Sequence, residues 1–333
     1  MFLSTLSSYA LVVAKTLDAR GVDSRALFRR AGLDPDDLRD PNARFPFLGM
    51  QKLWALAVEA TGDPCFGLSI VRNLHPTSLH ALGFSWLASA SLRDGFSRLS
   101  RYARIVSSVI AIDLDCPEES ACRLRVTTPG FDLDTVPASR DAGMASLVRL
   151  CRSSCGEQFH PLRVTLTRPR PPCDQAFQDF FRAPIEYAAD AETLWFGREQ
   201  IDMPLPTANA DLAMANDRIL TEYLADLERN SITLRTKAAV IERLPAGTVS
   251  TASIARALNM SPRTLQRRLR AEGTGYKELL DETRRELAAQ YIRSSRYSIN
   301  EITFLLGFSD VSNFSRAFKR WEGVSPSSFR LMA

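Results

Sequence analysis

The chain's 333 residues exceed a typical single domain and indicate two domains, while 45% hydrophobic and 24% charged residues are ordinary for a soluble globular protein. The net charge of +4 is unevenly distributed, because Ser231–Ala333 carries 17 Lys and Arg against 9 Asp and Glu, whereas Met1–Asn230 carries 25 against 29. A last third with a charge of +8 is expected of a domain that faces a polyanion, although charge alone leaves open a chance surplus on a solvated face.

The beginning of the chain does not have the pattern of an export signal. Leu6–Val13 is partly apolar, but Ser7 and Ser8 interrupt it, no basic residue precedes it, and Asp18 follows soon after. No stretch approaches the roughly 18 apolar residues needed to span a bilayer. We therefore expect a cytoplasmic protein with no membrane partner.

Six cysteines precede the basic region: Cys65, Cys116, Cys122, Cys151, Cys155 and Cys173. None forms a CxxC pair, and the three histidines are not spaced with them as a zinc site requires. Cys151 and Cys155 lie four residues apart on a predicted helix and can share a face. We expect buried free thiols, no metal and no cofactor.

Apolar spacing predicts mainly helices in the first hundred residues. One covers Leu6–Leu17 and ends near Gly21, and a second covers Ser24–Ala31. A third lies around Leu53–Val58, and a fourth covers Ser91–Val109 with apolar residues every three or four positions.

The pattern then changes to alternation. Val109–Leu114 and Ala121–Thr127 are rich in branched residues and flank a turn, which predicts a β-hairpin. A helix over Ser139–Cys155 follows, and Leu162–Thr167 and Thr193–Phe196 are predicted strands.

These elements predict an α+β domain over residues 1–206. The prolines at 169, 171 and 172 cannot lie in a central strand or a helix interior, so that run is a loop. Residues 207–230 form a helical connector, with its helix over Asn209–Glu228, and are a candidate dimerisation element.

Residues 231–333 contain one apolar pattern twice. Four positions recur at a constant offset: Ile254, Ala255, Leu258 and Met260 correspond to Ile302, Thr303, Leu306 and Phe308. Two more recur at an offset one position longer: Leu265 and Leu269 correspond to Phe314 and Phe318. Each copy predicts a helix, a tight turn and a second helix, which is a helix-turn-helix unit. Asn259 and Gly307 occupy matching turn positions, and both residue types tolerate a left-handed backbone.

The second helix of each copy presents polar residues outward. Ser261 and Pro262 are favoured at the start of the first of these helices, and Leu265 and Leu269 point into the core. The outward residues are Arg263, Gln266, Arg267 and Arg270 in the first copy, and Ser312, Asn313, Arg316, Lys319 and Arg320 in the second. Arginine bonds guanine bidentately, and Gln or Asn bonds adenine in the same way. Such residues also keep a helix soluble, but Arg267 and Arg316 share one repeat position, which favours DNA contact.

One long helical pattern, Tyr276–Ile292, joins the two copies. A helix of this length makes a rod of roughly 26–28 Å. It can place the two outward helices about one DNA turn, near 34 Å, apart. We therefore expect an all-α DNA-binding domain with its first helix-turn-helix at about 251–271, a linker helix at about 275–293 and its second helix-turn-helix at about 298–321.

Specific motifs run through this region: Met260–Leu269, Ile299–Ile302, Leu306–Asp310, Phe314–Lys319, Ser325–Pro326 and Phe329–Arg330. Over Ser231–Phe329 the chain closely resembles the DNA-binding domain of AraC/XylS-family transcription regulators. The resemblance implies base contacts by Arg263, Gln266 and Arg267 in the first unit and by Ser312, Asn313 and Arg316 in the second. Thr303 departs from the family, which commonly has Ala there.

Weaker features lie in the first domain: Leu53-Trp54, Thr61–Pro64, Gly67-Leu68, Leu82-Gly83 and Leu99–Tyr102. They are similar to the arabinose-binding-type sensor domain of many such regulators. This likeness implies a small-molecule effector, which we do not expect to be a sugar, and it leaves the pocket residues unassigned. Promoter DNA, RNA polymerase and a second copy of the chain are the expected further partners. Activation is the expected mode, and repression stays open.

Two other functions are weighed against this one. Catalysis by the first domain would need converging acids, thiols and histidines, but the acidic cluster from Asp113 to Glu119 has the pattern of a solvated turn. His75, His80 and His160 have no motif that links them to a Cys or Ser nucleophile, so no enzyme activity is expected. An architectural protein would bind cognate and random DNA alike.

Overall fold

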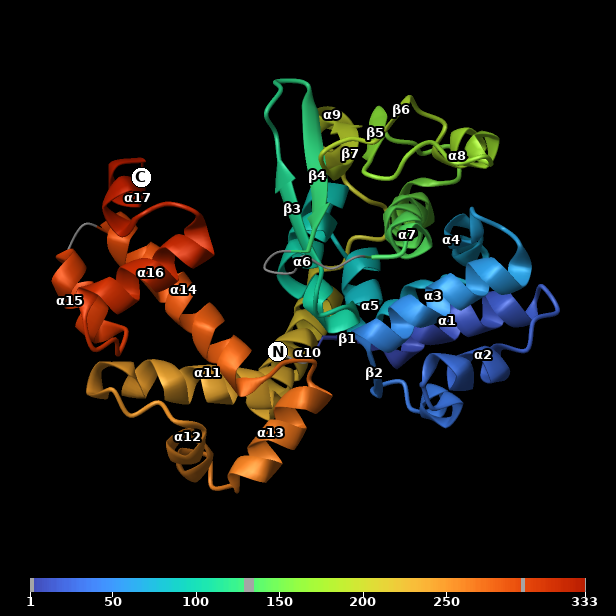
Figure 1. Cartoon of the computed structure of the whole chain (residues 1–333). Coiled ribbons are helices and arrows are strands. Elements are labelled where there is room, and N and C mark those ends of the chain that lie inside the picture. Colours follow the sequence, from blue (N-terminus) through green and yellow to red (C-terminus); the bar gives the residue numbers. More distant parts are fainter. Residues whose placement is uncertain (1–2, 129–134, 295–296, 333) are drawn as a thin grey trace. The chain divides into compact units, whose positions relative to one another are not determined.

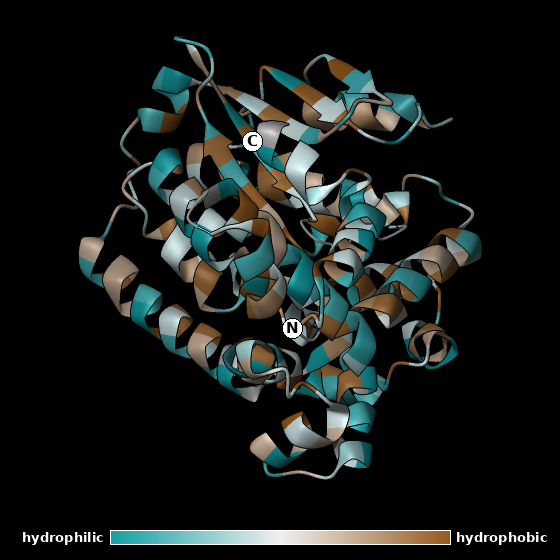
Figure 2. Ribbon diagram, turned by 60° about the vertical axis from the view of Figure 1, so that its left-hand side comes forward, coloured by the Kyte–Doolittle hydropathy of each residue, from teal (hydrophilic) through white to brown (hydrophobic). Residues whose placement is uncertain are grey.

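The computed structural model describes residues 3–128, 135–294 and 297–332, and the chain divides into two compact units, Leu3–Asp226 and Leu227–Ala333 (Figure 1). The first unit combines helices with sheets, and the described part of the second contains helices alone. The α+β and all-α predictions are therefore confirmed. Hydrophobic and hydrophilic residues alternate along the helices, as amphipathic elements with one buried face require (Figure 2). No helix among the described residues is long and apolar enough to cross a membrane.

The N-terminal unit begins with helices packed around one apolar core. The predicted helices are present as α1 (Ser7–Asp18), α2 (Ser24–Ala31) and α3 (Phe47–Thr61). A short antiparallel pair, β1 (Ser4–Leu6) with β2 (Arg44–Pro46), was not predicted. The remaining helical elements before the large sheet are η1 (Pro35–Arg39), α4 (Phe66–Ser69), η2 (Ile70–Arg72), η3 (Pro76–Leu79), α5 (Ala81–Leu87) and α6 (Leu92–Val106).

A five-stranded sheet of order β3-β4-β7-β5-β6 forms the second layer of this unit. Its strands are β3 (Ala111–Asp115), β4 (Ala121–Thr127), β5 (Arg163–Leu166), β6 (Ile185–Tyr187) and β7 (Glu192–Gly197). The predicted hairpin is β3–β4, and every neighbouring pair is antiparallel except β5–β6. Leu124 and Leu194 face each other across β4 and β7, and both are fully buried. The remaining helices are α7 (Pro137–Cys155), α8 (Asp174–Phe181), α9 (Arg198–Asp202) and α10 (Ala210–Asn230).

Helix α7 contributes to both cores of the N-terminal unit. Ala138 and Ala142 join the core of α1–α3, whereas Met144 and Leu147 join the core beneath the sheet. Gly67 lets α4 approach α7 closely, because a Cβ there would lie 2.2 Å from the Ala138 carbonyl oxygen. The two cores therefore meet along α7.

The prediction of buried free thiols is confirmed for Cys151 and wrong for the other five cysteines. The structure joins Cys65 to Cys173 and Cys116 to Cys122 by disulfides, and leaves Cys151 buried and Cys155 exposed as free thiols. Folding places partners 108 residues apart side by side, which residue spacing cannot show. Asp63 lies with Cys65 and Cys173 in a cluster of metal-ligand type, but the two sulfur atoms are bonded to each other.

The C-terminal unit is built around helix α14 (Tyr276–Ser294). Tyr276 and Leu279, in its first half, join the core of the first helix-turn-helix. Ala288 and Ile292, in its second half, join the core of the second. The other elements are α11 (Ile232–Arg243), η4 (Leu244–Ala246), α12 (Thr251–Ala257), α13 (Pro262–Ala271), α15 (Ile299–Leu305), α16 (Val311–Glu322) and α17 (Pro326–Met332). One helix thus links two separate small cores.

Candidate nucleic-acid interface and interior cavity

The internal repeat of the C-terminal unit extends to its backbone. The turn of the first copy is closed by Asn259 N–H to Arg256 O at 3.0 Å and by Met260 N–H to Ala255 O at 2.9 Å. The second copy has the same two bonds at the corresponding positions, at 2.9 and 3.0 Å. Asn259 and Gly307 have φ angles of +57° and +68°, so the predicted left-handed turns are confirmed. The two copies present their second helices, α13 and α16, in the same way.

Side-chain caps begin both second helices. Ser261 Oγ accepts from Thr264 N–H at 3.1 Å, and Asp310 Oδ1, at the corresponding position of the second copy, accepts from Asn313 N–H at 2.7 Å. This backbone hydrogen bond and one from Ser309 lower the pKa of Asp310, which is therefore a carboxylate. An anionic cap is favourable beside the positive end of a helix, although a phosphate nearby would repel it.

On α13 the predicted DNA-contacting residues point into solvent. Arg263, Gln266, Arg267 and Arg270 are all exposed, whereas Leu265 and Leu269 are fully buried. None of the four exposed side chains has a hydrogen bond or ion pair among the described residues. Their donors are therefore available to bases or phosphates.

On α16 two predicted residues belong to a hydrogen-bonded network. Asn313 Nδ2 donates to Asp310 Oδ2 at 2.5 Å and to Ser309 Oγ at 3.1 Å. Asn313 Oδ1 accepts from Arg316 Nη2 at 2.6 Å. The network engages Arg316 through Nη2. It therefore orients the exposed guanidinium and leaves its other N–H donors available to DNA.

The rest of α16 has the predicted arrangement. Phe314 and Phe318 are fully buried, while Ser312 and Lys319 are exposed. Arg320, which the sequence left available, forms an ion pair with Asp281 at 3.1 Å.

Arg284 of α14 holds the second turn, a role the sequence did not reveal. Its Nε donates to Leu306 O at 3.0 Å and its Nη2 to Gly307 O at 3.2 Å. Its guanidinium also lies 4.6 Å from the centre of the Phe308 ring. These contacts tie the second helix-turn-helix to the linking helix.

The N-terminal unit contains an apolar cavity of about 840 Å³, part of it open to solvent, where its two cores meet. Its apolar lining includes Trp54, Leu82, Leu99, Ala103, Val106 and Leu147. No charged side chain of the described residues lines it. A concave, mostly apolar lining with a few polar groups is typical of a small-molecule site.

An outer compartment of about 1040 Å³ shares several walls with this cavity, among them Gln51, Ser139 and Gly143. It differs from the inner cavity by its charged lining residues, Arg140, Asp190 and Glu192. The two compartments adjoin at their shared residues, so one is apolar and its neighbour is polar.

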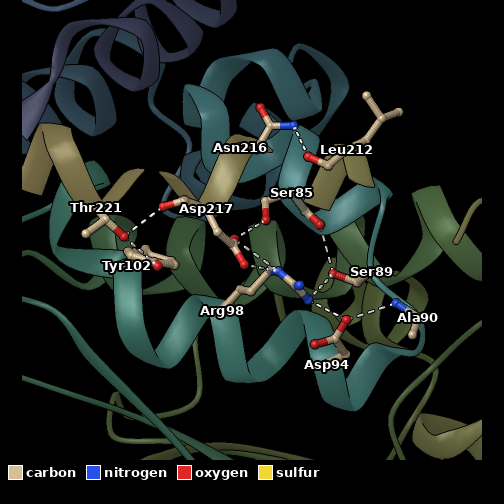
Figure 3. Close-up of polar contacts among 10 residues, drawn as sticks. All are labelled: Ser85, Ser89, Ala90, Asp94, Arg98, Tyr102, Leu212, Asn216, Asp217 and Thr221. Atoms are coloured by element: carbon tan, nitrogen blue, oxygen red, sulfur yellow. Dashed lines mark hydrogen bonds and ion pairs between the residues drawn. The ribbon is translucent and has the colours of Figure 1, made fainter. Parts of the chain in front are cut away.

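Helix α6 lines the cavity with Leu99, Ala103 and Val106. Through other side chains it contacts the connector helix α10 (Figure 3). Arg98 Nε donates to both carboxylate oxygens of Asp217, at 3.1 and 3.2 Å, and Ser85 Oγ donates to Asp217 Oδ1 at 2.6 Å. Tyr102 Oη lies 3.0 Å from Thr221 Oγ1, which itself donates to Asp217 O at 2.8 Å. The tyrosine is therefore the donor of that pair. These bonds fasten α10 to α6.

Four aromatic residues of the N-terminal unit do not line the inner cavity: Phe84, Trp86, Tyr102 and Trp195. Trp86 is buried and donates through Nε1 to Leu150 O, and Phe84 is 48% exposed. Trp195 lies between the guanidinium groups of Arg123 and Arg163. The fourth, Tyr102, faces α10.

The acidic hairpin residues considered for catalysis are exposed. Asp115 pairs with Arg123 at 2.6 Å, and Glu118 pairs with Arg163 at 2.5 Å. They are surface ion pairs.

Models of known protein families match parts of both units. Residues 21–205 match the arabinose-binding domain of AraC transcription regulator, N-terminal, and residues 254–332 match a helix-turn-helix domain. Residues 227–274 also match the CENP-B N-terminal DNA-binding domain. Both of the last two matches fall in the unit that carries the exposed arginines.

Two proteins named as regulators are similar to this chain over nearly its whole length. The ornithine utilization regulator of Pseudomonas aeruginosa is 29% identical over 97% of this chain and 95% of its own. The transcriptional regulator VirS of Mycobacterium tuberculosis is 27% identical over 93% of this chain and 91% of its own. Among solved structures, transcriptional regulator CdpR from Pseudomonas aeruginosa covers 97% of this chain and 98% of its own, with 21% identity and a TM-score of 0.47.

Proposed function

Because this chain belongs to the AraC family of transcription regulators, with a sequence-specific DNA-binding unit and an effector-binding N-terminal unit, we propose that one copy reads two successive major-groove segments of a promoter operator. The observation that carries this proposal is the structural repeat, which presents α13 and α16 alike at the two ends of α14 (Figure 1). The 19 residues of α14 span about 28 Å.

Each reading helix has base-contacting and phosphate-contacting residues in this proposal. Arg263, Gln266 and Arg267 contact bases from α13, and Ser312, Asn313 and Arg316 do so from α16. Arg270 and Lys319 lie at equivalent exposed positions of the repeat, one turn further from the helix start. We assign these two to phosphates, because a cation there orients the helix without reading sequence.

Selection of binding sites from random duplex DNA tests this function. The full-length chain should enrich sequences with two short preferred blocks about 10 base pairs apart, centre to centre. Affinity for the enriched site should exceed that for random DNA by about a thousandfold or more. A ratio near one would instead indicate an architectural protein.

The second part of the proposal is that the effector acts on DNA binding through α6 and α10. Leu99, Ala103 and Val106 of α6 line the cavity, whereas the adjacent Arg98 and Tyr102 hold α10. A ligand that shifts α6 therefore changes how α10 is held. Since α10 leads directly into the C-terminal unit, this changes the constraint on the DNA-binding helices.

Two substitutions on α10 test this connection. Asp217→Ala removes the bonds to Arg98 and Ser85. Asn216→Ala is the matched control because, among the described residues, Asn216 bonds only to Leu212 O of its own helix. In full-length protein, Asp217→Ala should change promoter output at least about threefold, whereas Asn216→Ala should not. Equal output from both variants would contradict the connection.

Helix α10 also offers a surface to a second copy of the chain. Leu212 and Ile219 lie two helical turns apart, so they share one helix face, and they are 56% and 48% exposed. Leu212 points away from α6 (Figure 3). We propose a homodimer through this face; Leu212→Lys should lower the mass measured by light scattering to that of one chain.

RNA polymerase is a further expected partner, through the family resemblance alone.

A further inference from the structure

We propose that the cavity of the N-terminal unit binds an acyl amide, with the aliphatic chain in the inner compartment and the neutral amide head in the outer one. The inference rests on the proposed function, which requires an effector site in this unit. It adds the chemical class of the effector.

The inner compartment suits an aliphatic chain because its lining is mostly apolar and the hydroxyls of Ser139 and Ser146 already have partners. Ser146 Oγ donates to Ala142 O at 2.6 Å and lies 3.3 Å from Tyr9 Oη. Ser139 Oγ donates to Val136 O at 2.9 Å. A sugar or a free amino acid would bury hydroxyl or charged groups here without replacing their bonds to water, which is costly. An alkyl chain gains from the same burial.

Gln51 lies where the two compartments join. Its Oε1 accepts from Val136 N–H at 2.8 Å and lies 3.2 Å from Ser139 Oγ. Its Nε2 amide has no hydrogen-bond partner among the residues with described positions. The junction therefore offers a donor to a carbonyl oxygen at the end of an alkyl chain.

The outer compartment presents an unmatched donor and an unmatched acceptor. Glu192 has a side chain only 9% exposed; its Oε1 accepts from Thr167 Oγ1 at 2.7 Å, whereas its Oε2 is buried with no hydrogen-bond partner among the described residues. Arg140 Nε, 3.7 Å from Glu192 Oε1, is likewise buried without a hydrogen bond in this part of the structure. The two side chains form a long ion pair, but Arg140 Nε and Glu192 Oε2 have no hydrogen bond within the described residues, so a molecule that both donates and accepts fits between them.

A neutral amide satisfies both groups. Its oxygen accepts from Arg140 or Gln51, and its N–H donates to Glu192. A carboxylate head only accepts hydrogen bonds, so it leaves Glu192 Oε2 without a donor, and it is repelled by Glu192 and by Asp190, which also lines this compartment. An ammonium head only donates, so it leaves Arg140 Nε without an acceptor. The donor and the acceptor together therefore favour a neutral amide head over either ion.

Gly143 allows a direct test of the site. It lies on α7 and lines both compartments, and a Cβ there would meet nothing within 4 Å. Gly143→Leu should fill the passage without disturbing the fold, and Gly143→Ala is the matched control. By calorimetry on the full-length chain, octanamide affinity should fall about tenfold or more in Gly143→Leu and stay within about threefold in Gly143→Ala, with an unchanged melting temperature in both.

The head group is tested with three ligands that share an alkyl chain. Octanamide should bind wild type more tightly than octanoate or octylammonium, and L-arabinose and L-ornithine should bind more weakly than all three. Glu192→Gln should improve octanoate binding relative to octanamide, because it removes the repelling charge. Unchanged octanamide binding in Gly143→Leu, or preference for either ion or for the two polar comparators, would overturn the inference.

Measurements of operator affinity and promoter output then distinguish failure of the ligand class from failure of the proposed connection through α6. If octanamide binds but leaves operator affinity and promoter output unchanged, the ligand class stands and the proposed connection through α6 fails. If octanamide does not bind but another compound changes promoter output, the connection stands and the ligand class is wrong.

Discussion

The two reading helices share a backbone and differ in how their side chains are held. The exposed arginines and Gln266 of α13 have no partners among the described residues, whereas Arg316 of α16 is oriented by Asn313, which Asp310 holds in turn. Binding through α13 must therefore order its side chains, at about 0.5–1.5 kcal/mol each. Much of that ordering is already present on α16. The same fold thus supports an adaptable reading helix and a preorganised one.

The largest expected effect comes from the cores beneath these helices. Leu269 and Phe318 occupy equivalent positions of the repeat, and both are fully buried. Phe318→Ala should destabilise the second helix-turn-helix by about 3–5 kcal/mol, and Leu269→Ala should destabilise the first by about 2–5 kcal/mol. Hydrogen exchange should show the loss of protection confined to the substituted half.

The two halves have separate cores that both pack on α14, and this separation is the reason for expecting separate losses. Equal loss of protection in both halves after either substitution would show that they unfold together. Retained stability with lost DNA binding in Phe318→Ala would contradict its core position.

Next in size is the loss of each equivalent arginine. Arg267→Ala and Arg316→Ala should each cost about 1–3 kcal/mol at the operator and relax preference at one base pair. Because Arg316 and Asn313 are hydrogen-bonded, their double substitution should be non-additive by about 0.5 kcal/mol or more. Gln266 and Arg267 serve as the control pair, and their effects should add more closely. Titration of each variant with operator DNA measures the loss of affinity and the non-additivity. Greater non-additivity for Gln266 and Arg267 than for Asn313 and Arg316 would contradict the contrast between the two helices.

The N-terminal caps of α13 and α16 should show a smaller effect on stability. Ser261→Ala and Asp310→Ala should each destabilise their helix by about 0.5–2 kcal/mol. Asp310 should lie at the upper end, because it also accepts from the Asn313 side chain. Thermal unfolding of the two variants compares them directly; a larger loss in Ser261→Ala would show that the Asp310 network adds no stability.

The smallest difference is expected at Arg270 and Lys319. Substitution of either by alanine should weaken binding to cognate and random DNA alike and reduce the salt dependence by about one phosphate contact. Affinity measured over a series of salt concentrations checks this. A change in base preference would mean that these residues read sequence.

The sequence was sufficient for the helix-turn-helix repeat because its information is local. Helical spacing, the cap Ser261 and the tolerant turn residues Asn259 and Gly307 act within a few residues of one another, and the structure confirms each. The exposure of the outward arginines followed from the buried Leu265 and Leu269.

The features that the sequence did not predict depend on distant contacts. The β1–β2 pair has very short strands and joins segments that α1 and α2 separate along the chain, and Cys65 meets Cys173 across 108 residues. The cavity is lined by side chains from both cores, and residues such as Leu99 have the same pattern whether they fill a core or line a pocket. Whether such a residue fills a core or lines the cavity depends on how the two cores meet along α7, which the sequence pattern does not reveal.

Footprinting of the operator bound by the monomeric Leu212→Lys variant tests the central claim most directly. The account predicts two protected major-groove segments about one helical turn apart on the same face of the DNA. It further predicts that Arg267→Ala weakens protection in one segment and Arg316→Ala in the other. A single protected segment, or loss of protection at the same base pairs in both variants, would contradict reading of two successive grooves by one chain.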